Sequence, residues 1–599
     1  MTIAIDPEPL RQKYREERDK RLRADGIEQY IRIAHHFPEY LDDPYMPVVD
    51  RTPMLDHVTF ALVGGGFAGL LTGARLHEVG ISDVRIIDKA GDFGGTWYWN
   101  RYPGAQCDTT SFIYMPLLEE TGHMPTEKYA HAPEILEHCR RIAMQYGLYE
   151  SALFHTEVTG LDWDGARDVW VIRTTRGDRF TARYVALGIG PLHVPKLPGI
   201  PGLESFRGHS FHTSRWDYEY TGGDWSGGPM TELGDKRVGV IGTGATAVQC
   251  VPHLARACRR LYVFQRTPSS VDARGNRPTD PDWFNHMATP GWQQRWLDNF
   301  AENQSIGFPD EDLVMDGWTD IARRIRARVL EMDPDERTLD NIMVAFEQSD
   351  FEKMEEIRAR VDSIVNDPAT AQKLKAWYRQ LCKRPCFHDE YLESFNLPNV
   401  ELVDTDGKGV ERITPAGVVV AGHEYEVDCI VYASGFEVGT DFTQRAGFEI
   451  TGREGRRLSD HWRDGMRTLH GVHVHGFPNL FILQPFQGAN LISNVPHNLY
   501  DAARTIAALV RRASDEDSMQ VEVRQEAEEA WMQLLATGQS ILQGPDCTPG
   551  YYNNEGHLED SRIRFLIGYP FGASAYFQYI DDWRSNGRFE GLEFRRGGA

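Results

Sequence analysis

The sequence of 599 residues contains no apolar run of about 18 residues or more, which excludes a membrane-spanning helix. Basic residues are scarce relative to acidic ones: 64 Lys and Arg against 88 Asp and Glu leave a formal net charge of −24. A field of that sign repels nucleic acid and anionic membranes, so neither is expected as a partner. Neither G-x-S-x-G nor H-E-x-x-H occurs, so hydrolase functions lack support.

Cysteine is also sparse. Eight residues are scattered along the chain without a paired spacing that suggests a disulfide, which predicts reduced thiols and a cytoplasmic protein. The amino-terminal residues have no apolar core of the kind found in signal sequences. His470, His473 and His475 are closely spaced, but no acid or cysteine completes a ligand set, so no metal is expected.

Glycine, in contrast, is abundant, with 56 residues, and its placement is informative. One stretch predicts a strand, a glycine-rich turn, a helix and a second strand, over residues 57–63, 64–69, 67–79 and 84–88. Gly64, Gly66 and Gly69 match G-x-G-x-x-G, the loop that binds a dinucleotide pyrophosphate. Asp88 follows Gly64 by 24 positions, where a ribose hydroxyl needs an acceptor. This unit therefore predicts a dinucleotide with a free ribose hydroxyl.

The same order returns downstream, over residues 236–241, 242–247, 245–257 and 261–265. The second loop has alanine in place of the third glycine, which the pattern permits, and consists of Gly242, Thr243, Gly244, Ala245, Thr246 and Ala247. Arg266, followed by Thr267, stands where the first unit has its acid. An acid would repel a 2′-phosphate, whereas arginine pairs with one. We therefore expect FAD at the first loop and NADPH (NADP⁺) at the second; NADH, with Arg266 as an ordinary surface residue, is the alternative.

Together the two units predict an α/β fold with two Rossmann-like dinucleotide-binding domains, for FAD and NADP, a helical insertion and an N-terminal helical arm. Helix-forming runs with several tryptophans predict the insertion, in which Asp367 precedes Pro368 as a helix cap. The predicted division is the arm over residues 1–54, the first part of the FAD-binding domain over 55–195, the NADP-binding domain over 196–385 with the insertion at 279–380, and the second part of the FAD-binding domain with a C-terminal loop over 386–599.

A more specific pattern lies between the two loops. Residues 206–217 match F-x-G-x-x-x-H-x-x-x-W-[PD] at every fixed position: Phe206, Gly208, His212, Trp216 and Asp217. Here the sequence resembles the type I Baeyer–Villiger monooxygenases. Residues 94–108 and 428–436 are similar to further family segments, with Ser434 in place of the usual threonine. The resemblance covers about residues 57–599.

This resemblance implies a flavoprotein that uses NADPH and O2 to insert one oxygen atom next to a ketone carbonyl, through a C4a-peroxyflavin, giving an ester or lactone. It implies that Arg384 stabilises the peroxide and the tetrahedral adduct, and that Asp108 lies near the flavin and pairs with Arg384. Lys383 would help Arg266 to bind the 2′-phosphate. Flavin contacts are implied for Thr96, Trp97, Asp108, Tyr114 and Val158.

Several questions stay open at this level. His212 and Trp216 belong to the fingerprint but need not touch substrate; His212, in the segment between the two cofactor domains, is expected to couple their motion, with proton transfer as the alternative. Residues 547–556 resemble the C-terminal loop of family members that act on bulky cyclic, steroidal or aryl ketones, which implies a roomy pocket. A flavin monooxygenase that oxidises nitrogen or sulfur shares both glycine loops and is the alternative function, although such relatives lack the Trp216-Asp217 ending. The oligomeric state is not indicated, and the expected partners are a small-molecule ketone and O2.

Overall fold

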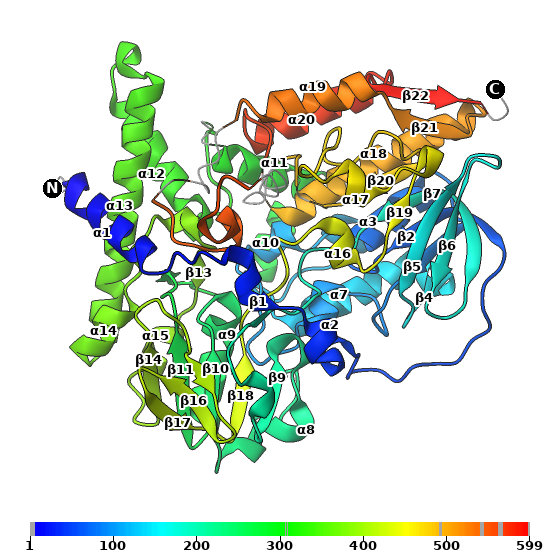
Figure 1. Cartoon of the computed structure of the whole chain (residues 1–599). Helices are drawn as coiled ribbons and strands as arrows, with labels where there is room; N and C mark the ends of the chain where they lie inside the picture. The colour runs from blue at the N-terminus through cyan, green and yellow to red at the C-terminus, as the bar shows by residue number, and fades with distance from the viewer. Residues whose placement is uncertain are drawn as a thin grey trace.

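The computed structural model contains two large β-sheets with helices around them, a helical insertion at one side and an amino-terminal arm across the front (Figure 1). It describes residues 6–305, 307, 309–484, 486–489, 494–538, 544, 546–560 and 567–596. No helix in these ranges is long and apolar enough to cross a membrane.

The first sheet has eight strands in the order β19-β5-β6-β7-β2-β3-β4, with β20 paired to β7. Strand β2 is parallel to both of its neighbours, and its last four residues are apolar and buried, as expected for a strand covered on both faces. The bounds are β2 His57–Val63, β3 Val84–Ile87, β4 Ala152–Leu153, β5 Val158–Asp164, β6 Val169–Thr174, β7 Arg179–Leu187, β19 Ile450–Thr451 and β20 Leu480–Ile482.

Two long helices share an apolar core against this sheet. Leu70 and Leu71 of α3 lie in one buried cluster with Ile506 and Leu509 of α18. Helices in this part of the chain are α3 Phe67–Glu78, α4 Thr96–Trp99, α5 Ser111–Tyr114, α6 Leu118–Thr121, α7 Ala132–Gln145, α16 Phe442–Ala446, α17 Leu458–His461, α18 Val495–Asp515, α19 Gln525–Leu535 and α20 Ala573–Ser585, with the hairpin strands β21 Gln520–Val523 and β22 Leu592–Arg595.

The second sheet is parallel throughout, in the order β14-β11-β10-β18-β9. Its strands are β9 His209–His212, β10 Arg237–Ile241, β11 Arg260–Gln265, β14 Val400–Asp404 and β18 Cys429–Tyr432, and the nearby helices are α8 Tyr218–Thr221, α9 Ala245–Ala257 and α15 Tyr391–Ser394. Beside it lies a small antiparallel sheet of β15 Arg412–Ile413, β16 Gly417–Val420 and β17 His423–Glu426.

This topology corrects one expected boundary. Strands β14 and β18 follow residue 386 and were expected with the first sheet, but they lie on either side of β10 and β11 in the second. Parallel strands pair across long connections, so their partners cannot be identified from the strand sequences alone. The expected boundary at 385/386 is therefore too early for the second sheet.

The expected helical insertion is present as five helices, α10 Pro281–Met287, α11 Trp292–Gln304, α12 Gly317–Glu331, α13 Leu339–Ile364 and α14 Pro368–Leu374. The predicted cap of α14 is confirmed, because the Asp367 side chain accepts a hydrogen bond from the Thr370 N–H at 2.8 Å. Trp292, Trp296 and Phe300 of α11 are buried in the core that the insertion shares with the second sheet. After the insertion, β13 Cys386–Phe387 pairs with β12 Val271–Asp272.

The amino-terminal arm is more than a surface helix. The charged run of residues 10–23, with opposite charges four positions apart, predicts a surface helix, but helix α1 spans Pro7–Asp19 and so starts and ends earlier. Tyr14 is 1% exposed and accepts a hydrogen bond from Arg358 of α13 at 3.3 Å. Farther along, α2 spans Ile33–His36, and β1 (Tyr30–Ile31) pairs with β8 (Leu197–Pro198). The arm is thereby held against the insertion and the segment that joins the two sheets.

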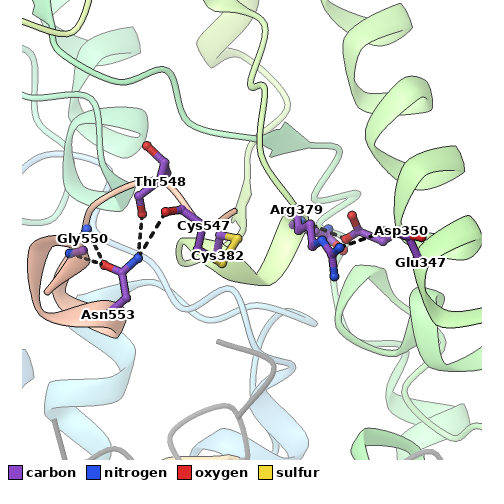
Figure 2. The surroundings of a disulfide bond; sticks show 10 residues. Glu347, Asp350, Arg379, Cys382, Cys547, Thr548, Gly550 and Asn553 are labelled. Atoms are coloured by element: carbon purple, nitrogen blue, oxygen red, sulfur yellow. Dashed lines mark hydrogen bonds and ion pairs between the residues drawn. A yellow bond between two sulfur atoms is a disulfide. The ribbon is translucent and has the colours of Figure 1, made fainter. Parts of the chain in front are cut away.

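The expectation that all cysteines are reduced is wrong. Cys382 and Cys547 form a disulfide across a sequence separation of 165 residues, with Cα atoms 5.1 Å apart (Figure 2). At that separation the pairing depends on tertiary contacts, and sequence spacing gives no sign of it. The other six cysteines are free and buried. The bond joins the residue directly before Lys383 and Arg384 to residues 547–556, which we call the late loop.

Candidate active site

A cavity of about 1230 Å³ lies where the carboxyl ends of β2 and β10 face each other. Both glycine-rich loops follow these strand ends, which is where parallel sheets bind ligands. The rest of the wall comes from segments far apart in sequence, including Tyr30, Trp97, Asp108, Lys383, Arg384 and Tyr551. The cavity is therefore lined by residues of both sheets, the arm and the late loop.

The first loop requires glycine for steric reasons. Gly64 has φ +112°, and a Cβ there would lie 2.4 Å from the backbone oxygen of Gly188. A Cβ on Gly69 would lie 2.1 Å from the Gly64 oxygen, so Gly69 serves the contact between helix and strand and does not line the cavity. Gly66 precedes α3, whose first turn has no side-chain cap, so its N–H groups are available to an anion.

Asp88 lies at the end of β3, on the cavity wall. Its carboxylate is 8% exposed and accepts hydrogen bonds from the N–H groups of Gly65 and Ala90. Burial raises the pKa of this carboxyl, and the two backbone donors oppose that rise. An ionised carboxylate has about four acceptor positions, so Asp88 retains capacity for a ribose hydroxyl.

The other expected flavin contacts also line the cavity. Trp97 Nε1 donates a hydrogen bond to Tyr114 Oη at 3.1 Å, and the two rings meet edge to face at 5.7 Å. Thr96 begins α4 and Val158 begins β5, and both line the cavity.

The second loop has the same steric requirement at its first glycine, but it has open space at its second glycine. Gly242 has φ +113° and its Cβ would meet the Ala433 oxygen at 2.4 Å, whereas a Cβ on Gly244 would meet no atom within 4 Å. That open space adjoins the uncapped first turn of α9, where Ala245 and Thr246 line the cavity. Thr243 Oγ1 donates to the Thr267 oxygen at 2.7 Å, which ties the loop to the end of β11. The remaining loop residue, Ala247, is buried in the core and does not reach the cavity.

Two cations adjoin the second loop. Arg266 and Lys383 come from chain segments on opposite sides of the insertion, and both line the cavity together with Thr267. Burial, reinforced by the charge of Arg266, lowers the pKa of Lys383 to about 8. The second loop therefore has one permanent positive charge and one that titrates near neutral pH.

Arg384 and Asp108 form an ion pair on the cavity wall, with Arg384 Nη2 2.5 Å from Asp108 Oδ1. Asp108 is 5% exposed, whereas 39% of the Arg384 side chain is exposed. Burial by itself would lower the pKa of Arg384, but Asp108 outweighs that effect and the pKa is raised. The guanidinium thus stays charged and is oriented by a buried carboxylate.

Trp318, which was not predicted as a site residue, contacts both Arg384 and Asp108. Its indole Nε1 donates to the Asp108 backbone oxygen at 2.8 Å, and the Arg384 guanidinium lies 5.5 Å from the ring centre. Trp318 sits in the first turn of α12, where the Asp316 side chain accepts a hydrogen bond from its N–H at 2.9 Å. No local motif marks Trp318, because its contacts depend on how the insertion packs.

The fingerprint residues do not line the cavity. His212 is fully buried, its Nε2 lies 3.1 Å from the Gly435 oxygen, and burial lowers its pKa to about 3. A Cβ on Gly208 would come within 2.5 Å of the Phe206 ring. Trp216 is buried, with its Nε1 bonded to Thr221, and Asp217 caps α8. The neutral His212 thus links β9 to the turn after β18, which does line the cavity.

Comparisons with known proteins identify the family. A family model described as "Pyridine nucleotide-disulphide oxidoreductase" matches residues 61–282. Neopentalenolactone D synthase of Streptomyces avermitilis is 50% identical over 99% of this chain and 100% of its own. A Baeyer–Villiger monooxygenase of Streptomyces coelicolor is 47% identical over 96% of this chain and 95% of its own. This chain belongs to the Baeyer–Villiger monooxygenases. The polycyclic ketone monooxygenase of Thermothelomyces thermophila shares the fold, with a TM-score of 0.90, 39% identity and coverage of 98% of this chain and 99% of that one.

As a Baeyer–Villiger monooxygenase, the enzyme uses FAD and NADP and inserts oxygen at a ketone. The cavity fits both cofactors. The close approach at Gly64 and the uncapped α3 suit the pyrophosphate of one dinucleotide, and the open space at Gly244 with the uncapped α9 suits that of the other.

Other parts of this monooxygenase's cavity were missed from sequence. Gln29 and Tyr30 come from the arm, and the Gln29 side chain accepts a hydrogen bond from Arg266. Tyr551 and Glu555 come from the late loop, which lies on the cavity wall. The resemblance of that loop to the C-terminal loop of family members pointed to a pocket, but no sequence feature distinguished Glu555 from the other acidic residues of the chain.

Proposed function

We propose that this enzyme converts a bulky cyclic ketone into a lactone or ester with NADPH and O2. The observation that carries the proposal is the Arg384–Asp108 pair on the wall of a cavity that both dinucleotide loops share. The names of two similar proteins, neopentalenolactone D synthase and polycyclic ketone monooxygenase, support a multi-ring substrate. The chain length, the arm and the late loop also resemble those of cyclopentadecanone monooxygenase.

In this proposal, each residue has a role suited to its position. FAD, when bound, supplies the reduced flavin that activates O2. Arg384 stabilises the negative charge that develops on the ketone oxygen, and Asp108 orients the guanidinium and offsets part of its burial cost. Trp318 holds Asp108 through its backbone oxygen. His212 serves the coupling of the two sheets, because a neutral, fully buried imidazole outside the cavity has no route to a substrate proton.

The chain is best divided around the two sheets. We propose an arm over residues 1–54, an FAD domain built on the first sheet, and an NADP domain built on the second sheet that includes the insertion and extends through β18. We also propose a cytoplasmic location, because six of the eight cysteines are free thiols, and fractionation of the native cells would test it.

A panel of ketones of graded ring size tests the proposed function. Purified enzyme with NADPH in air should give ester or lactone products, with kcat/KM highest for fused-ring ketones. The same enzyme with an alkyl aryl sulfide and no ketone tests the alternative. Sulfoxide formation without any ester from the panel would favour heteroatom oxidation and contradict the proposal.

Arg266 is expected to select NADPH over NADH. Arg266→Ala should raise the KM for NADPH about 10- to 100-fold, because a hydrogen bond to a charged group contributes about 1.5–3 kcal/mol. The KM for NADH should change little, since NADH lacks the 2′-phosphate. Arg259→Ala, at an exposed arginine that does not line the cavity, is the matched control. Unchanged selectivity in Arg266→Ala would reject this role.

Lys383 is expected to make NADPH use depend on pH. Because its pKa is about 8, Lys383 is charged below that pH and neutral above it. The kcat/KM for NADPH should therefore fall as pH rises from about 7 to about 9, whereas that for NADH should not fall at the same pKa. Lys383→Arg, which keeps its charge, should remove this fall. If the arginine variant retains the wild-type profile, another group is responsible.

A further inference from the structure

Glu555 places a buried negative charge among the cations expected to hold a 2′-phosphate. Its side chain accepts a hydrogen bond from Tyr30 Oη at 3.0 Å and lies 3.4 Å from Lys196 Nζ and 3.5 Å from Arg266 Nη2. Burial alone would raise the pKa of this carboxyl, but Lys196, Arg266 and Lys383 outweigh burial and hold the pKa below its ordinary value. Glu555 is therefore ionised at neutral pH.

The backbone around Glu555 is shaped to direct its side chain inward. Asn554, Glu555 and Gly556 have consecutive positive φ angles of 50°, 55° and 92°. Two adjacent non-glycine residues in this region are costly and persist only where the surrounding structure determines them. Such strain often marks a residue with a function, and here it brings a carboxylate to the cavity wall.

Asn553 and the disulfide hold the late loop in this position. The Asn553 side-chain oxygen accepts a hydrogen bond from the Gly550 N–H at 2.9 Å, and its amide donates to the Thr548 oxygen at 3.0 Å (Figure 2). The same side-chain oxygen accepts a second hydrogen bond, from the Gly556 N–H at 3.2 Å. Cys547 is bonded to Cys382, the residue directly before Lys383. The loop that carries Glu555 is thus tied covalently to the segment that carries a cation of the site.

We propose that Glu555 is a specificity-determining residue that competes with the 2′-phosphate of NADP for Arg266 and Lys383. This rests on the proposed assignment of the second loop to NADPH. A phosphate carries about −1.5 to −2 charges against one for a carboxylate, so it can displace Glu555, but part of its interaction with the cations is then used for the displacement. A nucleotide without the 2′-phosphate leaves the contacts of Glu555 in place. Glu555 therefore lowers the ratio of the affinity for NADPH to the affinity for NADH.

Binding of two small nucleotides tests this without catalysis. Titration calorimetry on FAD-loaded enzyme would compare adenosine 2′,5′-bisphosphate with adenosine 5′-monophosphate, which differ only in the 2′-phosphate. Glu555→Gln should lower the Kd of the bisphosphate about tenfold and change that of the monophosphate less than about twofold. Glu559→Gln, at an exposed acid of the same segment that pairs with His557, should change neither Kd.

An increase in the Kd of the bisphosphate in Glu555→Gln is equally informative. If Glu555 instead orients Arg266 for the phosphate, Glu555→Gln would weaken bisphosphate binding. That result would overturn the inference. An unchanged Kd for the bisphosphate, or equal changes for both nucleotides, would overturn it as well. Glu555→Ala repeats the test should the glutamine variant not retain FAD. Arg266→Ala separates the role of Glu555 from the assignment of the second loop to NADPH. If Arg266→Ala leaves bisphosphate binding intact, the assignment of the second loop fails. If Arg266→Ala abolishes bisphosphate binding while Glu555→Gln has no effect, only the role of Glu555 fails.

Discussion

Arg384→Ala should abolish ester formation while FAD binding and NADPH oxidation persist. Arg384 is held by Asp108 at 2.5 Å on the wall of the shared cavity, so its removal takes away the fixed cation beside the reacting carbonyl. Loss of one such stabilising group costs about 100- to 1000-fold in rate, and loss of a full charge should reach at least the upper figure. Parallel assays of NADPH consumption and ester product would measure the two activities separately.

Two further variants separate charge from geometry. Arg384→Lys keeps a positive charge but loses the planar fork that pairs with Asp108, so it should recover only a small part of the ester activity. Asp108→Asn keeps the shape but leaves the guanidinium without its charged partner, and it should reduce ester formation more than NADPH oxidation. Ester formation by Arg384→Ala at close to the wild-type rate would remove Arg384 from the mechanism.

Gly64→Ala should produce protein without FAD. The residue combines φ +112° with a Cβ position 2.4 Å from the Gly188 oxygen, so alanine meets both an unfavourable backbone conformation and a clash with backbone atoms that cannot rotate away. The loop would move from its place beside the first turn of α3, where the pyrophosphate is expected to bind. The visible flavin absorbance of the purified variant, together with its Tm, would measure this loss.

Gly244→Ala is the matched control in the second loop. A Cβ there meets no atom within 4 Å, so this variant should fold normally and keep FAD. The added methyl group would enter the space assigned to the NADP pyrophosphate, and the KM should rise for NADPH and NADH alike. Full flavin content in Gly64→Ala would show that the first loop tolerates the change and would contradict the steric account.

The features predicted well from sequence are those set by local order. The strand at 57–63 and the helix at 245–257 have the expected bounds, because turn glycines and apolar runs mark their ends directly. The α/β fold followed from these glycine turns and apolar runs, and the family followed from the fingerprint at residues 206–217. Loops of this kind carry their own steric requirements, such as the positive φ angles of Gly64 and Gly242.

Features that depend on distant contacts were not predicted. The placement of β14 and β18 in the second sheet, and the bond between Cys382 and Cys547, depend on how segments more than 100 residues apart pack together. Trp318 and Glu555 likewise acquire their positions from the insertion and the late loop. A single tryptophan or glutamate gives no sign of such a role in the sequence, because its partners are assembled only by the fold.

The most direct test of the proposed reaction is an oxygen-18 labelling experiment. Purified enzyme would be incubated with NADPH, a fused-ring ketone and oxygen-18 gas in unlabelled water, and the product would be analysed by mass spectrometry. We predict a lactone or ester that carries one labelled atom at the ring oxygen and an unlabelled carbonyl, with one NADPH consumed per product. A product labelled from water, a hydroxylated ketone, or NADPH consumption with no oxygenated product from any ketone would contradict it.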